Sequence, residues 1–226
     1  TLPLVLGVCA FSEKSAEVIR KKITERGLSP EILGLGGQVP IMRMTYQKPK
    51  LGKLVVRAVY SLRRFFPNTT FHVYGAGGLG WYPIVRLLGA DSADYAGYLR
   101  HAGMGRVLIP KIGARYISKK VRINSRLNKI THVRCSREVA NPKELSELKD
   151  CRCPVCRGTD VLSLEKDKNK RVIHNLYVVL SESKLIDKYC LNSDFSSLKN
   201  FIRDNIIKHN PVLSEAAKYS MKLISR

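Results

Sequence analysis

Short apolar runs alternate with amphipathic segments over the first 95 residues of the chain. The run at 4–8 is continuously apolar, as expected for a strand buried on both faces of a sheet. Three further strands are predicted, at 31–35, 71–74 and 90–95. Helices are predicted between them, at 12–27, 51–65 and 79–88. The pattern is therefore an alternation of strands and helices.

The predicted helix boundaries follow from capping and breaking residues. Ser12 can cap a helix that Gly27 ends, and Pro67 stops the helix over 51–65. Apolar side chains recur at helical spacing in both helices, at Ala16, Ile19 and Ile23 and at Leu51, Leu54, Ala58, Leu62 and Phe65. Strands joined by helices require parallel pairing, which predicts an α/β fold. A complete (β/α)8 barrel needs roughly 250 residues, so four strands here predict half of one.

Special residues follow the carboxyl end of each predicted strand. They are Cys9, Ala10 and Phe11, then Gly36, Gly37 and Gln38, then Gly75, Ala76, Gly77 and Gly78, and finally Asp94. Ligands bind at this edge both in barrels and in open α/β sheets. Glycines there can also serve only to make tight turns. Four such groups on one edge favour a binding site.

The composition is that of a folded protein with an unusual charge. The 226 residues are 44% hydrophobic and 26% charged, which excludes disordered, collagen-like and coiled-coil classes. Forty Lys and Arg against 18 Asp and Glu give a net charge of +22, which favours a polyanionic partner over a merely solvated surface. No apolar run is long enough to cross a bilayer, so a cytoplasmic location is expected. The first residue is Thr1, inside a predicted strand, and a piece of a longer protein is therefore expected.

The segment 95–137 contains no Asp or Glu, and Lys or Arg fills eleven of its positions. Such a segment suits contact with phosphates, because a solvated basic face would normally include acidic residues. The predicted nucleic-acid contacts are Arg100, Arg106, Lys111, Arg115, Lys119, Lys120, Arg122 and Arg126. We assign this segment to a first domain at 1–137.

Three cysteines fall within six residues, which is metal spacing rather than a disulfide framework. Cys151, Cys153 and Cys156 form a C-x-C-x-x-C motif, and His174 follows 18 residues later. Three thiolates and an imidazole make a closed, structural Zn²⁺ site. By spacing alone, His132 and His209 are alternatives to His174. Cys9, Cys135 and Cys190 are predicted to be small buried apolar residues. The second predicted domain, 138–226, combines this zinc-binding subdomain with a basic helical tail that carries Leu198, Phe201 and Ile202 at helical spacing.

Together these motifs resemble the tRNA-guanine transglycosylase superfamily, which includes relatives that insert 7-deazaguanines into DNA. The zinc motif is followed by a His-Asn pair, here His174 and Asn175. A G-x-D-x-x-D stretch matches residues 89–94, and a strand ending in a glycine-rich turn matches residues 72–77. Gly36 and Gly37 match a Gly-Gly pair that lies against the purine in the family. The next three residues, 38–40, are similar to the archaeal branch. The resemblance covers roughly residues 4–180 and implies the C-terminal half of a TIM barrel.

The resemblance implies base exchange without chain cleavage. Asp94 is the implied nucleophile, which attacks C1′ of a guanosine to form a covalent ester that a 7-deazaguanine base then captures, as in queuosine or archaeosine synthesis. Asp91 is the neighbour most easily confused with it, but residues 91 and 94 of a strand point to opposite faces. The implied substrate contacts are Gly36, Gly37, Gln38, Gly75 and Gly77.

The chain also departs from the family pattern. Leu6 stands where the family usually has a Gln that reads the base, and the upstream half with its second carboxylate is absent. We therefore expect a missing N-terminal barrel half or a partner chain, with a dimer as a further alternative.

Three alternatives to a tRNA-modifying enzyme remain open. The extreme charge and the lack of an RNA-binding module favour a DNA-modifying enzyme, whereas the frequency of tRNA substrates in the superfamily favours tRNA. Leu6, in place of the Gln that the family usually has there, favours a non-catalytic nucleic-acid-binding subunit. The presence of Asp94 argues against it. A zinc-ribbon protein without any chemistry fits the strand–helix repeats least.

Overall fold

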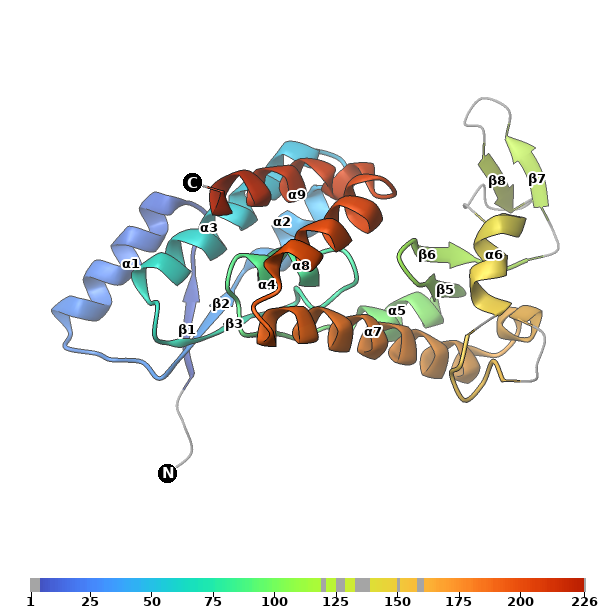
Figure 1. Cartoon of the computed structure of the whole chain (residues 1–226), viewed down its shortest axis with the longest axis horizontal. Helices are drawn as coiled ribbons and strands as arrows, with labels where there is room; N and C mark the ends of the chain where they lie inside the picture. Colours follow the sequence, from blue (N-terminus) through green and yellow to red (C-terminus); the bar gives the residue numbers. More distant parts are fainter. Residues whose placement is uncertain are drawn as a thin grey trace. The chain divides into compact units, whose positions relative to one another are not determined.

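A computed structural model describes residues 5–118, 121–124, 129–132, 139–149, 151–157 and 161–225 (Figure 1). The chain forms two compact units. Unit 1 contains Thr1–Tyr95 and Ser183–Arg226, and unit 2 contains Ala96–Glu182. The domain boundary predicted between residues 137 and 138 lies outside the described residues. No helix in the described part of the chain is long and apolar enough to cross a membrane.

Unit 1 is built on a parallel sheet, which confirms the predicted α/β class. Its strands are β1 (Val5–Cys9), β2 (Ile32–Gly36), β3 (Thr70–Val73) and β4 (Ser92–Ala93), hydrogen-bonded in the order β1-β2-β3-β4. The fourth strand is shorter than the predicted 90–95. That these strands form half of a barrel stays a prediction.

The three helices predicted in the first 95 residues are present, as α1 (Glu13–Glu25), α3 (Gly52–Phe65) and α4 (Tyr82–Leu87). Two further short helices, α2 (Gln38–Met44) and η1 (Pro49–Leu51), were not predicted. Ser12 caps α1, and its hydroxyl accepts a hydrogen bond from the backbone N–H of Ser15 at 3.1 Å while the Ser15 hydroxyl accepts one from the backbone N–H of Ser12 at 2.8 Å. This reciprocal cap confirms the predicted start of the helix.

The two faces of the sheet differ in burial. Leu33, Leu35, Phe71 and Val73 point to the face that packs against the helices, and all four are fully buried. On the opposite face, alternate residues remain at least partly accessible along β1, β3 and β4. The prediction that the run 4–8 is buried on both faces is therefore wrong, because every second residue of β1, beginning with Val5, is exposed.

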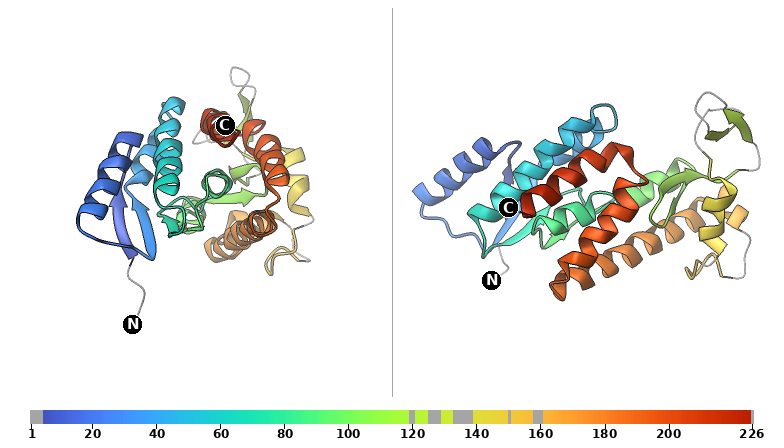
Figure 2. Two further views of the ribbon diagram at one scale, coloured as in Figure 1. Left: turned by 60° about the vertical axis from the view of Figure 1, so that its left-hand side comes forward. Right: turned by 45° about the horizontal axis from the view of Figure 1, so that its top comes forward.

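The C-terminal helices complete the core of unit 1. They are α8 (Phe195–Phe201), the π-helix η3 (Ile202–Ile207) and α9 (Pro211–Ile224). The predicted apolar stripe of Leu198, Phe201 and Ile202 is buried in the same core as the sheet. Helix α3 contacts both α1 and α9 (Figures 1 and 2). A Cβ on Gly52 would lie 2.9 Å from Ala216, so only glycine allows α9 to approach α3 this closely.

Unit 2 contains two small antiparallel hairpins and a cysteine-rich turn. Its elements are α5 (Gly97–Gly103), β5 (Arg106–Ile109), β6 (Gly113–Tyr116), β7 (Val121–Asn124), β8 (Lys129–His132), α6 (Pro142–Lys149) and η2 (Val161–Glu165). Helix α7 (Lys168–Leu191) begins in this unit and ends in unit 1. The core of unit 2 is small and includes Val107, Ile109, Leu148 and Leu164 beside the buried Cys153.

Candidate metal centre and catalytic edge

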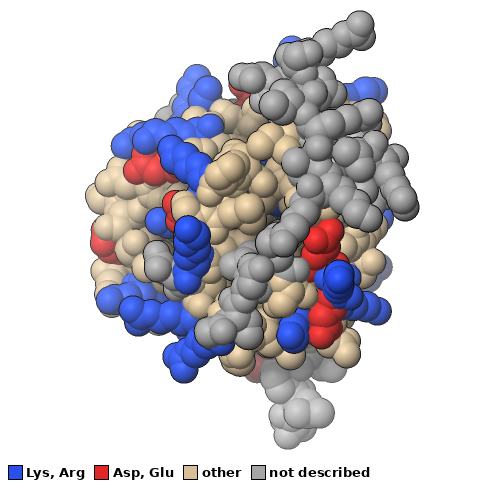
Figure 3. All heavy atoms as spheres, turned by 90° about the vertical axis from the view of Figure 1, so that its right-hand side faces the viewer, with Lys and Arg blue, Asp and Glu red and all other residues tan. Residues whose placement is uncertain are grey.

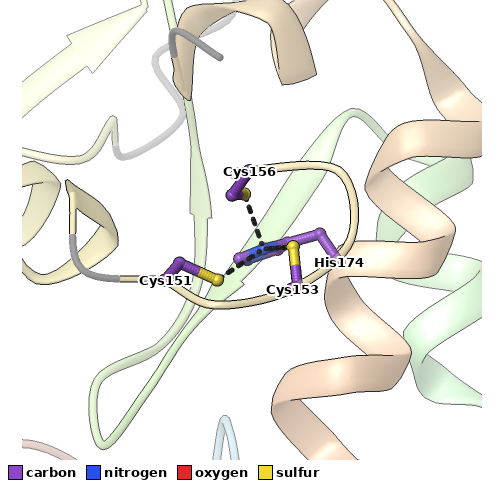
Figure 4. A group of neighbouring side chains, drawn as sticks. All are labelled: Cys151, Cys153, Cys156 and His174. Carbon is purple, nitrogen blue, oxygen red and sulfur yellow. Dashed lines mark hydrogen bonds between the residues drawn. The ribbon is translucent and has the colours of Figure 1, made fainter. Parts of the chain in front are cut away.

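The four predicted metal ligands come together in unit 2 (Figure 4). The Sγ atoms of Cys151, Cys153 and Cys156 lie 3.6, 3.6 and 3.4 Å from Nδ1 of His174. All four donor atoms lie within 4.8 Å of one another. His209, an alternative from the sequence, is not part of the cluster found among the described residues.

The ring of His174 is oriented for metal binding. Its Nε2 lies 2.8 Å from the backbone oxygen of Leu108, and because a carbonyl oxygen only accepts, Nε2 carries the proton. The Nδ1 lone pair therefore points at the three sulfurs. Asn175 supports this arrangement, since its Oδ1 accepts from the Leu108 N–H at 2.7 Å and its Nδ2 donates to the oxygens of Tyr98 and Arg106. Such outer hydrogen bonds fix the tautomer and direction of a metal-binding histidine.

The chemistry of the cluster fits a divalent cation. Burial raises the pKa of the Cys153 thiol, and contact with Cys151 raises the pKa of Cys156. The hydrogen bond between Cys156 and Cys151 also lowers the pKa of Cys151 to about 4. A tetrahedral Zn²⁺ would balance the negative charge of three thiolates at this site. Because four protein donors fill a tetrahedral shell, the site suits a structural rather than a catalytic ion.

Asp94 follows β4 at the carboxyl edge of the sheet in unit 1. Its Oδ1 accepts a hydrogen bond from the backbone N–H of Gly75 at 2.8 Å and lies 3.3 Å from Nε2 of His72. Its backbone oxygen accepts from Gly77 N–H at 2.9 Å. The side chain of Asp94 is 56% exposed, so its carboxylate is open to a ligand.

The glycine-rich turn makes these contacts sterically possible. Gly75 has φ +75°, and a Cβ there would lie 2.3 Å from Cγ2 of Val39. A Cβ on Gly77 would lie 2.9 Å from the backbone oxygen of Asp94. Any larger residue at either position would displace the turn that holds the carboxylate.

Asp91 has a different environment from Asp94. Its Oδ2 accepts from the backbone N–H of Phe71 at 2.7 Å and from Nη2 of Arg63 at 2.5 Å. Arg63 also donates to the backbone oxygens of Gly89, Pro67 and Thr69. Asp91 thus ties the start of β4 to β3 and to the end of α3.

The predicted substrate contacts after β2 divide into accessible and inaccessible residues. Gly37 is exposed, has φ +73° and immediately precedes α2, and Gly36 is half-buried. Gln38 is fully buried, and its Nε2 donates to the backbone oxygens of Ala10 at 2.7 Å and Gly36 at 3.0 Å. Gln38 therefore connects the ends of β1 and β2 and has no surface for a ligand.

Two of the remaining cysteines differ from the sequence prediction. Cys9 is exposed and Cys190 is half-buried, so the prediction that both are buried is wrong, while Cys135 lies outside the described residues. Cys9 is exposed because it lies on the uncovered face of the sheet, at the end of β1.

Sequence reasoning missed His72 and Tyr74. Nδ1 of His72 lies 2.8 Å from Oγ of Ser92, and the His72 ring meets the Tyr74 ring edge to face at 4.6 Å. The period of two along β3 puts residues 72 and 74 on one face, and pairing with β4 brings residues 92 and 94 to the same face. That alternation was the signal by which the sequence could have found them.

The described Lys and Arg side chains of the basic segment differ in their environments. Figure 3 shows several groups of Lys and Arg, some with Asp or Glu beside them. Arg115 forms an ion pair with Glu144 at 3.0 Å, and the guanidinium of Arg106 lies over the Tyr116 ring. Arg100 and Lys111 are exposed. The predicted contacts Lys119, Lys120 and Arg126 lie outside the described residues, and Arg122 is described only as part of the backbone of β7.

Comparison with known proteins gives relatives but no matching family model. A protein of Methanosarcina mazei is 28% identical over 164 residues, which cover 71% of this chain and 27% of the relative. Relatives from Archaeoglobus fulgidus and Methanocaldococcus jannaschii are 26% and 24% identical and cover 87% and 94% of this chain. All three are named tRNA-guanine(15) transglycosylase.

The chain spans only part of these relatives. It covers 27% of the proteins from M. mazei and M. jannaschii and 37% of the one from A. fulgidus. The matches confirm the resemblance seen in the motifs.

Proposed function

We propose that this chain, as part of the tRNA-guanine transglycosylase superfamily, carries the nucleophile of an enzyme that exchanges a guanine in tRNA for a 7-deazaguanine. The relatives support a tRNA substrate. The observation that carries the proposal is the setting of Asp94, whose exposed carboxylate stands at the ligand-binding edge of a parallel sheet with Oδ1 held by the Gly75 N–H.

In the proposed reaction, a carboxylate oxygen of Asp94 bonds to C1′ of the target nucleotide. The bond from C1′ to N9 breaks, and guanine leaves with the electron pair and takes up a proton. The N9 atom of the incoming base then attacks C1′, loses its proton and releases the carboxylate. This is covalent catalysis of the kind that carboxylates perform on sugars. The resemblance assigns proton transfer to a second carboxylate, which lies in the upstream half of the family's barrel.

A Zn²⁺ ion would hold Cys151, Cys153, Cys156 and His174 as a structural crosslink. Its position beside the small core of unit 2 supports a role in folding that unit. Since Leu108 is hydrogen-bonded to both His174 and Asn175, the site would also fix the hairpin of β5 and β6. That hairpin carries part of the basic segment, which supports a role in presenting phosphate contacts.

The experiment uses the complete protein that contains this chain, with labelled guanine and either tRNA or duplex DNA. If the label enters tRNA, the proposal is supported. If the label enters only DNA, the substrate is DNA and not tRNA. With incoming base withheld, the wild type should form a denaturant-resistant adduct with the polynucleotide. Asp94→Asn should bind the nucleic acid and form no adduct, while the matched variant Asp91→Asn should still form it.

The second candidate function is a non-catalytic nucleic-acid-binding subunit. It is favoured by Leu6, which stands where the family usually reads the base with a Gln. If the wild-type protein binds tRNA and DNA but forms an adduct with neither, this second function replaces the first. If Asp91→Asn abolishes the adduct and Asp94→Asn does not, the nucleophile is Asp91.

A further inference from the structure

The accessible face of the sheet in unit 1 carries three side chains next to Asp94 to which the proposed reaction assigns no role: His72, Tyr74 and Ser92. His72 lies on β3 and Tyr74 directly follows that strand, while Ser92 lies on β4 and Asp94 directly follows it. The strand register pairs His72 directly with Ser92. Both ring nitrogens of His72 have partners in this cluster, Ser92 on one side and Asp94 on the other.

The directions of these hydrogen bonds follow from the chemistry of the groups. A carboxylate only accepts, so Nε2–H of His72 donates to Oδ1 of Asp94 across 3.3 Å. In the neutral ring, Nδ1 then accepts from the hydroxyl of Ser92 across 2.8 Å. The result is a chain of donors that runs from Ser92 through His72 to Asp94.

We infer that His72, oriented by Ser92, is a positioning residue that aims Asp94 at its target. This inference rests on the proposed function of Asp94 as the nucleophile. Oδ1 receives two hydrogen bonds, from Gly75 N–H and from His72, while Oδ2 has no hydrogen-bond partner among the residues that the structure describes. Two donors on one oxygen restrict rotation of the carboxylate, and the other oxygen, Oδ2, is left as the one that bonds to C1′.

The ring of His72 is itself held in place. It meets the Tyr74 ring at an interplanar angle of 70°, and the His72 side chain is only 22% exposed. Tyr74 in turn lies against Gly34, where an added Cβ would be 2.7 Å from the tyrosine ring. The absence of a side chain at Gly34 gives Tyr74 its place, and Tyr74 limits the orientations open to His72.

Two substitutions of His72 separate positioning from general structural damage. The amide nitrogen of Gln reaches approximately the position of Nε2, whereas that of Asn corresponds to Nδ1. His72→Gln should therefore retain the donor to Asp94, and His72→Asn should lose it. In the complete protein, adduct formation in a single turnover should slow about tenfold or more in His72→Asn, which is the scale of one hydrogen bond to a charged group. It should stay within about threefold of wild type in His72→Gln, since the donor persists.

The matched control is Thr70→Ala, which changes an exposed residue on the same face of β3 outside the cluster and should leave the rate unchanged. Thermal midpoints should agree among the variants. Equal slowing by Gln and Asn, or a wild-type rate in His72→Asn, overturns the positioning role while leaving Asp94 as nucleophile. Absence of an adduct in the wild type is a different result, which removes the proposed function and the positioning role with it.

The hydrogen-bond chain can also be tested without activity. Nitrogen-15 NMR of the His72 side chain should show the tautomer protonated at Nε2, and Ser92→Ala should change the Nδ1 shift more than the Nε2 shift. A ring protonated only at Nδ1 cannot donate to Asp94 and overturns the inference.

Discussion

Replacing Asp91 by alanine tests whether this carboxylate is structural and Asp94 is not. Asp91 accepts from the backbone N–H of Phe71 at 2.7 Å and from Arg63 at 2.5 Å, and the arginine also bonds backbone oxygens of the loop that precedes β3. Alanine removes the acceptor and leaves the Phe71 N–H and one guanidinium nitrogen without this partner.

The expected loss of stability follows from these two contacts. A hydrogen bond to a charged group contributes about 1.5–3 kcal/mol. The ion pair adds less than about 1 kcal/mol, because the Asp91 side chain is 50% exposed. We expect Asp91→Ala to lower the free energy of unfolding by about 2–3 kcal/mol, and Asp91→Asn by about 1 kcal/mol because the amide oxygen can still accept from Phe71. Asp94→Ala should lower it by less than about 1 kcal/mol, since water can reach the exposed Gly75 N–H.

Trp81 provides the assay. It is the single tryptophan of the chain, it is 9% exposed, and it belongs to the core of unit 1. Its fluorescence during urea unfolding should report that unit, with a lower midpoint and an unchanged slope for Asp91→Ala. A wild-type midpoint for Asp91→Ala, or a loss above about 2 kcal/mol for Asp94→Ala, would refute the assignment of the two carboxylates.

Three further predictions follow from single contacts. Gly75→Ala should destabilise unit 1 by about 1–2 kcal/mol in the Trp81 assay, because φ is +75° and the new Cβ would meet Val39. Burial raises the pKa of Glu182 to about 7, so its contribution to stability is present below its ordinary pKa of 4.5 and is lost as pH rises to about 7. Glu182→Gln should remove about 3 kcal/mol of the change in unfolding free energy with pH. The measurement compares variant and wild type in urea unfolding followed by NMR of the buried Val107 methyls. Arg100→Gln should reduce the slope of log K against log salt concentration for tRNA binding by the amount expected for about one phosphate contact. Arg115→Gln should leave this slope unchanged, because Arg115 is ion-paired with Glu144.

The difference from wild type matters for Glu182 because another group in unit 2 acts in the opposite direction. Burial lowers the pKa of His101 to about 4, so its contribution to stability is lost as pH falls below about 6.5. Only the variant that removes one group separates the two slopes.

Much of the fold could be predicted because local patterns determine it. Ala16 and Ile23 are buried at their predicted helical spacing, and Leu33 and Leu35 lie in the core of the sheet. The cysteine spacing likewise predicted the metal centre, since a tight turn brings nearby thiols together without help from the rest of the fold.

What the sequence left out depends on contacts between distant segments. Helix α2 was missed because its seven residues include a proline and show no long apolar period. Packing of α9 on α3 depends on residues more than 100 positions apart, as in the hydrogen bond of 2.8 Å that Arg57 donates to the hydroxyl of Tyr219. His72 was missed for the same reason, because its role depends on Ser92 and Asp94 from another strand.

The metal centre should matter more for unit 2 than the apolar core does. Unit 1 buries a large cluster from its sheet and helices, whereas the core of unit 2 is small and includes two of the cysteines themselves, Cys153 and Cys156. A small core stabilises little by itself, and structural Zn²⁺ in such domains contributes on the order of 10 kcal/mol.

We therefore expect one Zn²⁺ per chain, and we expect chelation to unfold unit 2 while the Trp81 signal of unit 1 changes little. His174→Ala should lose the metal, whereas His209→Ala, outside the cluster, should retain it. Metal analysis of the purified protein and of both variants measures the first expectation. Hydrogen exchange at β5 and β6 after chelation measures the second, and equal protection with and without metal would show that the core of unit 2 suffices by itself.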